Sequence, residues 1–307
     1  MPWMQDLLPD LRRWLARGDA IALAVVTATR RSAPRPVGSV LGVSSSGELA
    51  GSVSGGCVEN EVYGEAREVL EGAPARQRTF GISDDAALQV GLPCGGEIDV
   101  FVAAAEADLV RRAIEEVEAG HVVTVQPAGE GLEVVSRPPP RLFVVGAVDT
   151  AEALCRGGRA LGWRTIVADP RARFATPERL PSADELLLLW PEEALAQVAP
   201  DEGTAVVVLA HEDRFDLPAL AGALASDAFY VGAIGSRRTQ AARREKLLEL
   251  GVAEEAIDRI NGPAGLDLGA DTPAETAVSI LAEILAVRAG REGGSLRGHT
   301  GRIHAAV

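Results

Sequence analysis

The chain has few cysteines, no long apolar run and fewer basic than acidic residues, and each of these features excludes a class of protein. Its 307 residues include three cysteines, Cys57, Cys94 and Cys155, a small and odd number that does not suit a disulfide framework and fits a reducing cytosol. No apolar segment reaches about 18 residues, so we expect no membrane-spanning helix. The first residues show no basic region followed by an apolar run, so we expect no signal peptide and a cytoplasmic location.

The balance of charges limits the partners. The formal net charge of -14 argues against binding to nucleic acid or to an anionic membrane, although an acidic total still allows a local basic pocket. Apolar residues make up 47% and charged residues 24%, which is ordinary for soluble globular proteins. The length predicts roughly two domains.

The most distinctive stretch is a glycine-rich turn before a helix, at residues 51–61. A strand of small residues ends in Gly55 and Gly56, and an apolar-periodic helix begins at Cys57 and continues past Glu59. Glycines let the backbone turn sharply, and the first turn of a helix has unpaired N–H groups that favour an anion. The same field favours thiolate over thiol and predicts a reactive Cys57. A buried structural cysteine behind a glycine turn explains the pattern equally well.

A second cysteine has a similar setting, since Cys94 is followed by Gly95 and Gly96 and then by a strand over 98–103. The two cysteines suit a disulfide couple, ligands to a metal or cofactor, or a sulfur carrier with a helper. Metal is the weakest of the three, because their spacing matches no compact zinc pattern and no histidine lies near either. Cys155 lies within a helical pattern and is expected in the core.

The domain boundary is marked by Arg-Pro-Pro-Pro-Arg at residues 137–141, which breaks regular structure and predicts a stiff linker. We expect a mixed α+β domain over 1–136, a second domain over 141–290 and a flexible tail over 291–307. In the first domain, a loop over 30–38 is rich in arginine and proline. Its arginines suit a phosphate or a carboxylate, although a solvated loop also fits.

The second domain begins with the pattern of a dinucleotide-binding fold. A buried strand over 142–145 leads through Gly146 into a helix, and a second strand over 165–168 ends at Asp169. An acid at this place takes a ribose hydroxyl in such folds. The middle glycine of the usual motif is replaced by Val148, whose methyl groups would crowd a pyrophosphate. We therefore predict a doubly wound parallel sheet without ordinary nicotinamide binding.

Further strands over 185–189, 204–209 and 228–234 alternate with helices, as in a doubly wound sheet, where ligands bind beyond the carboxyl ends of the strands. His211 follows one strand and suits a base, a hydrogen-bonding group or a structural loop residue. Gly235 follows another and opens a helix; Ser236 to Thr239 there, with two arginines, predict a phosphate site, with a capped helix as the alternative. Asp267 lies in a glycine-rich loop.

Several long stretches together resemble XdhC/CoxI-type accessory proteins of molybdenum hydroxylases such as xanthine dehydrogenase and aerobic carbon monoxide dehydrogenase. The resemblance runs from about the first strand to the last helix. It is carried by residues 32–38, 51–59, 92–96, 169–171, 231–239 and 265–276.

The resemblance implies binding of the molybdenum pterin cofactor, support of its sulfuration with a cysteine desulfurase, and insertion into the target enzyme. It implies a maturation factor more than a catalyst with its own turnover, and a homodimer is compatible with it. The family usually has Gly-Ala-Gly-His after the first strand of the second domain. This sequence has Val148 and Asp149 in the last two places, which argues against a nucleotide or NAD(P) at this turn.

The candidate residues are taken from these motifs. Cys57 and Cys94 are expected to carry the chemistry, and no metal site is expected. The candidate cofactor-binding residues are Ser32, Arg35, Gly38, Gly55, Gly56, Glu59, Gly95, Gly96, Gly146, Asp169, His211, Gly235, Ser236, Arg237, Arg238, Thr239 and Asp267. Two other functions fit the residues. One is an NAD(P)-dependent oxidoreductase, and the other is a thiol-disulfide protein that uses Cys57 and Cys94.

Overall fold

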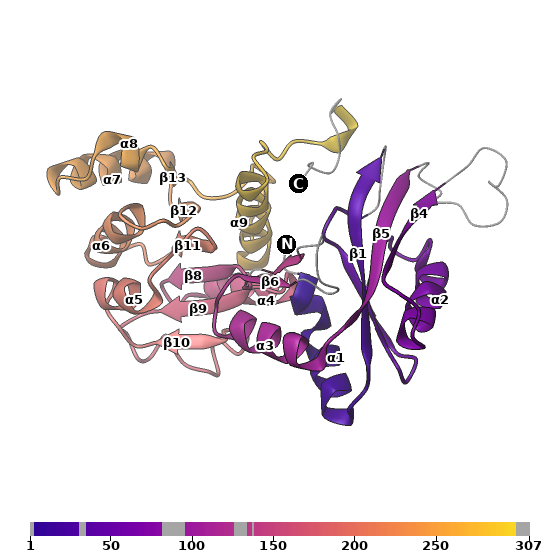
Figure 1. The fold of residues 1–307 in the computed structure, drawn as a ribbon. Coiled ribbons are helices and arrows are strands. Elements are labelled where there is room, and N and C mark those ends of the chain that lie inside the picture. The colour runs from indigo at the N-terminus through magenta and orange to yellow at the C-terminus, as the bar shows by residue number, and fades with distance from the viewer. Residues whose placement is uncertain (1–2, 31–34, 82–95, 126–133, 137, 299–307) are drawn as a thin grey trace. The chain divides into compact units, whose positions relative to one another are not determined.

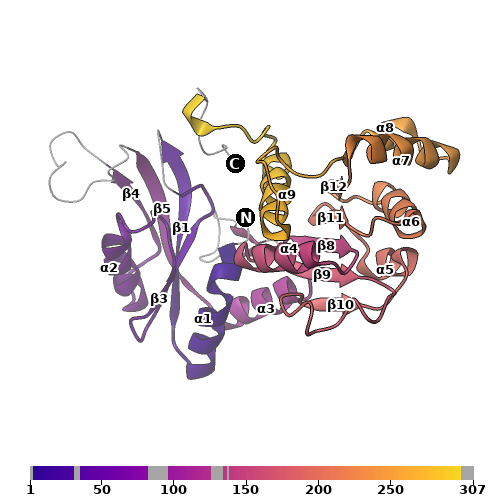
Figure 2. The ribbon, with the colours of Figure 1, turned by 180° about the vertical axis from the view of Figure 1, so that it is seen from behind.

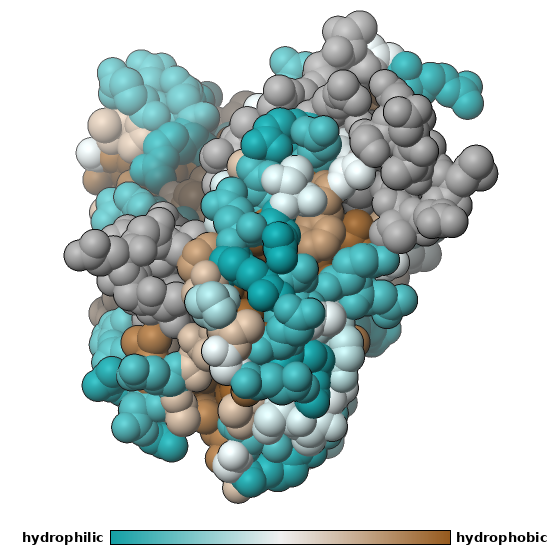
Figure 3. Space-filling view, turned by 45° about the vertical axis from the view of Figure 1, so that its right-hand side comes forward, coloured by the Kyte–Doolittle hydropathy of each residue, from teal (hydrophilic) through white to brown (hydrophobic). Residues whose placement is uncertain are grey.

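The structure is a computed structural model and describes residues 3–30, 35–81, 96–125, 134–136 and 138–298. The chain folds into two compact units, unit 1 up to Pro138 and unit 2 from Pro139. Among the described residues, no helix is long and apolar enough to cross a membrane. The face drawn in Figure 3 is mostly hydrophilic, with apolar residues in smaller patches.

Unit 1 is built on a five-stranded antiparallel sheet with helices on both faces (Figure 1). In the order in which they pair, its strands are β3 (Leu49–Gly51), β2 (Val40–Ser44), β1 (Ile21–Arg30), β5 (Glu97–Ala105) and β4 (Arg76–Gly81). Its helices are α1 (Trp3–Arg17), α2 (Glu59–Leu70) and α3 (Ala107–Glu118). Strands β6 (Val123–Val125) and β7 (Val134–Ser136) form a separate hairpin.

The alternation of side chains along β1 divides the core of unit 1 into two layers, because successive residues of a strand point to opposite faces. Ile21, Leu23 and Val25 pack with residues of α1 and α3. Ala22, Ala24 and Val26 pack with residues of α2. Both faces of the sheet are therefore covered.

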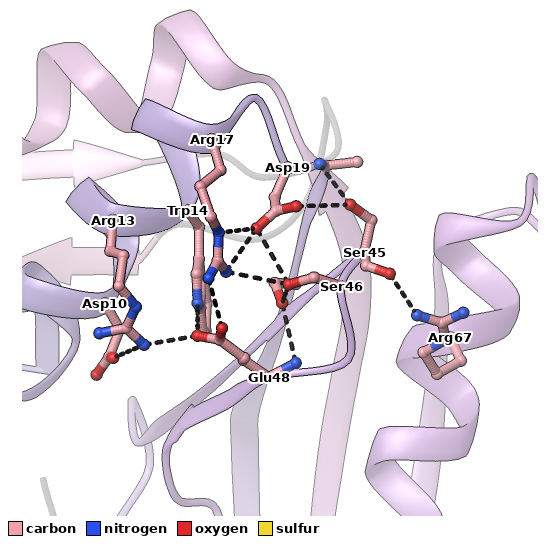
Figure 4. A network of polar contacts seen from close by, with 11 residues as sticks. Asp10, Arg13, Trp14, Arg17, Asp19, Ser45, Ser46, Glu48 and Arg67 are labelled. Carbon is pink, nitrogen blue, oxygen red and sulfur yellow. Dashed lines mark hydrogen bonds and ion pairs between the residues drawn. The ribbon is translucent and has the colours of Figure 1, made fainter.

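A cluster of polar contacts attaches α1 to the hairpin between β2 and β3 (Figure 4). The carboxylate of Glu48 accepts hydrogen bonds from Arg17 at 2.6 Å, Arg13 at 2.6 Å and Trp14 Nε1 at 2.7 Å. Hydrogen bonds from Arg17, Arg13 and Trp14, in that order, lower the pKa of Glu48 to about 2. The hairpin tip and α1 are thus held together by charge-assisted hydrogen bonds.

Unit 2 is a doubly wound sheet of six parallel strands. In spatial order they are β10 (Glu185–Leu187), β9 (Arg164–Ala168), β8 (Arg141–Val145), β11 (Thr204–Val208), β12 (Tyr230–Ala233) and β13 (Ile260–Asn261). The order reverses between β8 and β11, which is the point where ligands bind in such sheets.

Helices cover both faces of this sheet, as Figure 2 shows from behind. Helices α4 (Asp149–Ala160) and α9 (Pro273–Arg288) pack on one face. The other face is covered by α5 (Pro191–Val198), α6 (Asp213–Leu224), α7 (Arg237–Glu249) and α8 (Glu254–Ile257). A short 3-10 helix, η1 (Leu296–Gly298), lies near the end of the described residues.

The predicted fold class is confirmed: an antiparallel mixed unit is followed by a doubly wound parallel sheet. Cys155 is fully buried in α4, as predicted, and its burial raises the pKa of the thiol to about 12. One boundary differs from the prediction, because the helix expected to start at Cys57 starts at Glu59, with Val58 as its N-cap.

Candidate functional site

The turn that carries Cys57 leads from β3 into α2. Gly55 and Gly56 adopt φ values of 76° and 109°, which disfavour a side chain, so glycine is needed at both positions. Cys57 is half-buried and packs against the layer between the sheet and α2. The turn is therefore anchored to the core by its cysteine.

The backbone donors of this turn are used within the turn itself. The carboxylate of Glu59 accepts from the N–H groups of Ser54 at 2.9 Å and Gly56 at 2.8 Å. The Ser54 hydroxyl accepts from the N–H groups of Cys57 at 2.9 Å and Val58 at 3.0 Å, and itself donates to Glu59. The sequence predicted open donors for an anion here; in the structure the protein's own carboxylate takes that place.

The charge on Glu59 is stabilised by these contacts. Partial burial acts to raise the pKa of Glu59, but hydrogen bonds from the hydroxyls of Ser52 and Ser54 and from the backbone outweigh it and lower the pKa to about 2. Glu59 is therefore a structural acid of the turn, and its role was not visible in the sequence beyond its place in the motif.

The Cys57 turn lies toward the end of the sheet at which β1 finishes. Strands β1 and β3 both pair with β2 in antiparallel fashion, so they run in the same direction. Ser52, just beyond β3, donates its N–H to Val40 O at 3.0 Å, so the chain leaves β3 toward the end of the sheet where β1 also ends. The later part of α2 contacts the opposite end, where Arg67 donates to Ser45 O at 2.8 Å. Near the finish of β1, Arg30 pairs with Glu97, the first residue of β5.

A clamp at this end joins β1, β5 and β4. Both terminal nitrogens of Arg30 contact the buried carboxylate of Asp99, at 3.1 and 2.7 Å, and Thr79 Oγ1 donates to it at 2.7 Å. The guanidinium of Arg30, followed by the Thr79 hydroxyl, lowers the pKa of Asp99. The clamp fixes the end of β1, which the loop over 30–38 follows, and the start of β5, which Gly96 precedes.

The remaining candidates of unit 1 divide into described and undescribed residues. Gly96 is buried, Arg35 is exposed, and Gly38 has φ 84° and donates its N–H to Val26 O at 2.8 Å. The three candidates Ser32, Cys94 and Gly95 lie outside the described residues.

In unit 2 the central loops at the carboxyl ends of β8 and β11 are in contact. Gly146 has φ 110°, and a Cβ added there would lie 2.8 Å from Ala210 N. Glycine is thus required both by conformation and by the approach of the two loops. The next residue along the β11 loop, His211, is exposed and has a left-handed backbone with φ 61°.

The acid predicted to bind a ribose is engaged by protein groups. Asp169 is 2% exposed, and its Oδ2 accepts from Ala147 N at 2.9 Å and from Arg171 Nη2 at 2.7 Å. Its Oδ1 accepts from the backbone N and Nε of Arg171, both at 2.9 Å. Burial acts to raise the pKa of Asp169, but the hydrogen bonds from Arg171 and Ala147 outweigh it and the pKa is lowered. Both carboxylate oxygens are already used.

The start of α4 is also unsuited to a pyrophosphate. Val148 is its N-cap and Asp149 its first residue, so an exposed carboxylate lies where a phosphate would meet the helix. Together with Asp169, these residues argue against dinucleotide binding in the usual position.

The start of α7 is different. Ser236 caps the helix by accepting from Thr239 N at 3.1 Å, after a turn in which Gly235 has φ 128°. The first turn of α7 holds no acidic residue and begins with Arg237 and Arg238, both exposed, whereas α4, α5 and α6 each begin with acids. This helix start is the one of the four that favours an anion.

A buried network that sequence reasoning missed supports this turn. Arg243 of α7 contacts Asp216 Oδ2 of α6 at 2.7 Å, and the two are 4% and 2% exposed. Arg243 also donates to Ile234 O at 3.3 Å and Gln240 Oε1 at 2.7 Å, and Gln240 donates to Ala233 O at 2.9 Å. The network fixes the end of β12, from which the turn departs. The sequence does not reveal this network, because charged residues within a predicted helix are ordinarily expected to face solvent.

The glycine-rich loop of Asp267 lies next to β12, since Ala264 N donates to Ala233 O at 3.0 Å. Ser279 Oγ donates to Leu266 O at 2.5 Å and so ties the loop to α9, while Asp267 itself is exposed. Within the part of the chain that the structure describes, no three His, Cys, Asp or Glu side chains are placed to hold a metal ion.

Known proteins resemble this chain in both units. A family model described as the XdhC and CoxI family matches residues 14–81, and one described as the XdhC Rossmann domain matches residues 142–284. The molybdenum cofactor insertion chaperone PaoD of Escherichia coli (strain K12) is 30% identical over 297 residues, which cover 91% of this chain and 86% of that protein.

Two further proteins are similar over most of their length. One, from Bacillus subtilis (strain 168), is named as a probable subunit of xanthine dehydrogenase; it is 24% identical over 312 residues, covering 87% of this chain and 92% of that protein. A crystal structure described as a xanthine dehydrogenase from Bacillus halodurans has a TM-score of 0.76 at 20% identity, and covers 94% of this chain and 98% of that one. The latter likeness shows a shared fold.

Proposed function

The chain belongs to the XdhC and CoxI family, as its sequence motifs predicted, and on that premise we propose that it is an accessory protein for molybdenum enzymes. It binds the molybdenum pterin cofactor as cargo and delivers it to a hydroxylase of the xanthine dehydrogenase type. The names of two relatives, an insertion chaperone and a probable xanthine dehydrogenase subunit, support this proposal.

The observation that carries the proposal is the start of α7. The cofactor is an anion through its phosphate, and this helix start combines a serine cap, two exposed arginines and no acid in its first turn. Backbone N–H groups at a helix start and guanidinium groups are the usual ligands of phosphate. Ser236, Arg237, Arg238 and Thr239 would hold the phosphate, and Gly235 allows the backbone to approach it.

A second part of the proposal concerns the cysteines of unit 1 and the handling of sulfur. When bound, the cofactor supplies an oxo-molybdenum centre held by a dithiolene, and thiolates suit such a centre or a sulfur in transit. Cys57 would contact that centre, with Cys94 as its helper. Support of sulfuration, together with a cysteine desulfurase, belongs to the same proposal.

The oxidoreductase alternative has the fold in its favour and the local chemistry against it. The buried, arginine-paired carboxylate of Asp169 and the acid at the start of α4 leave neither ribose acceptor nor phosphate site in the usual place. A titration with NAD that leaves the intrinsic fluorescence of the protein unchanged would rule out the oxidoreductase alternative.

The experiment that tests the proposal is cofactor binding to the purified protein after gel filtration, with molybdenum and pterin both measured. The variant Arg237→Ala/Arg238→Ala should bind at least about tenfold more weakly, because each lost charge-assisted hydrogen bond is worth roughly 1.5–3 kcal/mol. Helix α3 also carries two consecutive exposed arginines, Arg111 and Arg112, and the variant Arg111→Ala/Arg112→Ala is the matched control. Equal binding by both double variants would refute the site, and no binding by the wild type would refute the function.

A further inference from the structure

A cluster of aromatic and arginine side chains lies in unit 2, and the phosphate site at the start of α7 does not use it. The rings of Trp190 and Phe215 have centroids 5.3 Å apart and planes tilted by 38°. The guanidinium carbon of Arg171 lies 4.4 Å from the ring centroid of Phe174 and 5.1 Å from that of Phe215. We call this group the ring cluster; it consists of Arg171, Phe174, Trp190, Glu212, Arg214 and Phe215.

The topology of the sheet brings the ring cluster together. Residues 171–174 follow β9, Trp190 follows β10, and residues 212–215 follow β11. All three strands belong to the parallel sheet, so their carboxyl ends lie at one edge, where ligands bind in doubly wound sheets. Strand β12 pairs with β11 and leads from the same edge to Ser236 at the start of α7. The ring cluster and the proposed phosphate site therefore share one edge of the sheet.

Trp190 is exposed although its position is fixed. It is 46% exposed, whereas Trp14 and Trp163 are 0% and 4% exposed. Its backbone N–H donates to Glu193 Oε2 at 3.2 Å, and its ring packs against Phe215, which is buried. A large ring that is held in place and half open to solvent gains free energy when another flat surface covers it. Trp190 therefore offers a stacking surface to a ligand.

The charges around these rings balance one another. Arg171 contacts Asp169 at 2.7 Å and Glu212 at 2.9 Å. Arg214 contacts Glu212 at 2.7 Å, and its guanidinium carbon lies 4.6 Å from the ring centroid of Phe215. Two guanidinium groups are thus matched by two carboxylates. This balance suits an uncharged ring, whereas the two exposed arginines at the start of α7 suit an anion.

One carboxylate of the ring cluster keeps an acceptor position for a ligand. Glu212 Oε1 accepts from Arg171 Nη1 at 2.9 Å, and this is its one hydrogen bond within the described residues. A carboxylate oxygen has two acceptor positions. Since the side chain of Glu212 is 39% exposed, a ligand that covers Trp190 can donate a further bond to it.

We propose that the ring cluster binds the pterin ring of the cargo, with Trp190 as its stacking surface and Glu212 as the acceptor for its amino edge. The pyrimidinone part of a pterin is flat and uncharged, and it carries an amino group beside a ring N–H. Those donors suit a carboxylate oxygen. Stacking on aromatic side chains is a usual way in which proteins hold flat heterocycles.

The inference deepens the proposed function and rests on it, because the ring cluster would hold one end of the same cargo whose phosphate meets the start of α7. Two separate contacts of different chemistry fix the orientation of a ligand better than a phosphate site alone. A purine base offers a similar flat ring with an amino group. The test therefore includes adenosine.

The test uses a pterin that has no phosphate, dithiolene or metal. The purified full chain is titrated with hydroxymethylpterin, and binding is followed by quenching of the pterin fluorescence. Trp190→Leu should weaken binding by about five- to a hundredfold, the range expected for the loss of one stacked ring, while Trp190→Phe keeps a ring and should lose less. Leu250→Ala is the control, because Leu250 is exposed but lies at the far end of α7 from Ser236, and it should bind as the wild type does.

A matched ligand tests the role of Glu212. In hydroxymethyllumazine a carbonyl replaces the amino group, so it should bind the wild type more weakly than hydroxymethylpterin, and Glu212→Gln should reduce this difference. A difference of the same size in Glu212→Gln would refute the acceptor role.

Three results would overturn the assignment to a pterin. They are the absence of saturable quenching by the wild type, equal binding by the wild type and Trp190→Leu, and displacement of the pterin by adenosine at a lower concentration than that of the pterin itself. Cofactor binding is measured separately. Cofactor bound equally well by the wild type and Trp190→Leu would contradict this inference alone, and hydroxymethylpterin bound without any binding of the cofactor would contradict the proposed function.

Discussion

Removal of Arg243 offers a stringent test of how the start of α7 is supported. The variant Arg243→Met keeps an unbranched side chain of similar length and deletes the guanidinium. The buried carboxylate of Asp216 then loses its bond at 2.7 Å, and the carbonyl of Ile234 and the amide of Gln240 each lose a donor.

The magnitude follows from the burial of the pair. Asp216 and Arg243 are 2% and 4% exposed, and Asp216 Oδ1 has no hydrogen-bond partner within the described residues. Breaking a buried pair by removing one partner typically costs about 3–5 kcal/mol, because an uncompensated charge stays behind. Replacing both partners, in Asp216→Leu/Arg243→Met, should restore much of the stability, since apolar packing then replaces the pair.

The loss should depend on pH. Burial raises the pKa of Asp216 above its ordinary value, while Arg243 acts to lower it. A raised pKa in the folded state means that folding favours the protonated carboxyl of Asp216. The stability that this group allows is therefore present at low pH and is lost as the pH rises through the folded pKa. Without Arg243 the pKa rises further, and the variant should therefore be destabilised more at pH 8 than at pH 5.5.

Urea titration with hydrogen-exchange mass spectrometry of the β11 and β12 peptides reports unfolding of unit 2 alone. The neighbouring Arg244 is the control, because it is on the same helix, pairs with Glu254 and Asp258 at the surface, and should be replaced with little effect. A loss of stability in Arg243→Met no greater than in Arg244→Met, or one equal at both pH values, would refute the reasoning.

Three further predictions concern single contacts. Gly146→Ala should destabilise unit 2 by about 2–4 kcal/mol, because the new Cβ would lie 2.8 Å from the backbone of Ala210 and φ is 110°. Gly64→Ala in α2 is the control: its new Cβ meets no atom within 4 Å and should stabilise the protein by about 0.5–1 kcal/mol. Chemical unfolding measures both changes. Asp99→Asn should lower the melting temperature of unit 1 at pH 7 and have little effect well below pH 4. The pKa of Asp99 is lowered in the folded state, so its carboxylate stabilises that state at pH values above the ordinary pKa, and this stability is lost as the pH falls through the folded pKa. Calorimetry at the two pH values checks this. Glu48→Gln should increase amide exchange in α1, with α3 unchanged, because Arg13 and Arg17 lose the charged carboxylate to which both donate.

Much of the fold was predictable because periodicity reports burial directly. The apolar runs at 142–145 and 204–209 predicted two of the strands, and the turn at Gly146 predicted the doubly wound class. The N-cap of α2 was misplaced by two residues, because Cys57 and Val58 continue the apolar pattern although their backbone is still in the turn.

The site was less predictable, since a motif identifies a backbone turn but not what fills it. Nothing in the order of residues 52–59 shows that Glu59 folds back onto the amides before it. The pairing of Asp169 with Arg171 was hidden for the same reason, because an acid after a strand suits a ribose and a guanidinium equally. Asp216 and Arg243 lie 27 residues apart and meet only through the packing of α6 on α7.

The most direct test of the central claim is delivery of cargo. Purified protein loaded with molybdenum pterin cofactor is mixed with the cofactor-free form of a molybdenum hydroxylase, and the recovered hydroxylase activity and the molybdenum left on the chain are measured together. The account predicts that activity appears as molybdenum leaves the chain, and that Arg237→Ala/Arg238→Ala supports less of it than Arg111→Ala/Arg112→Ala. Activity that is recovered equally from free cofactor, with no metal carried by the chain, would contradict it.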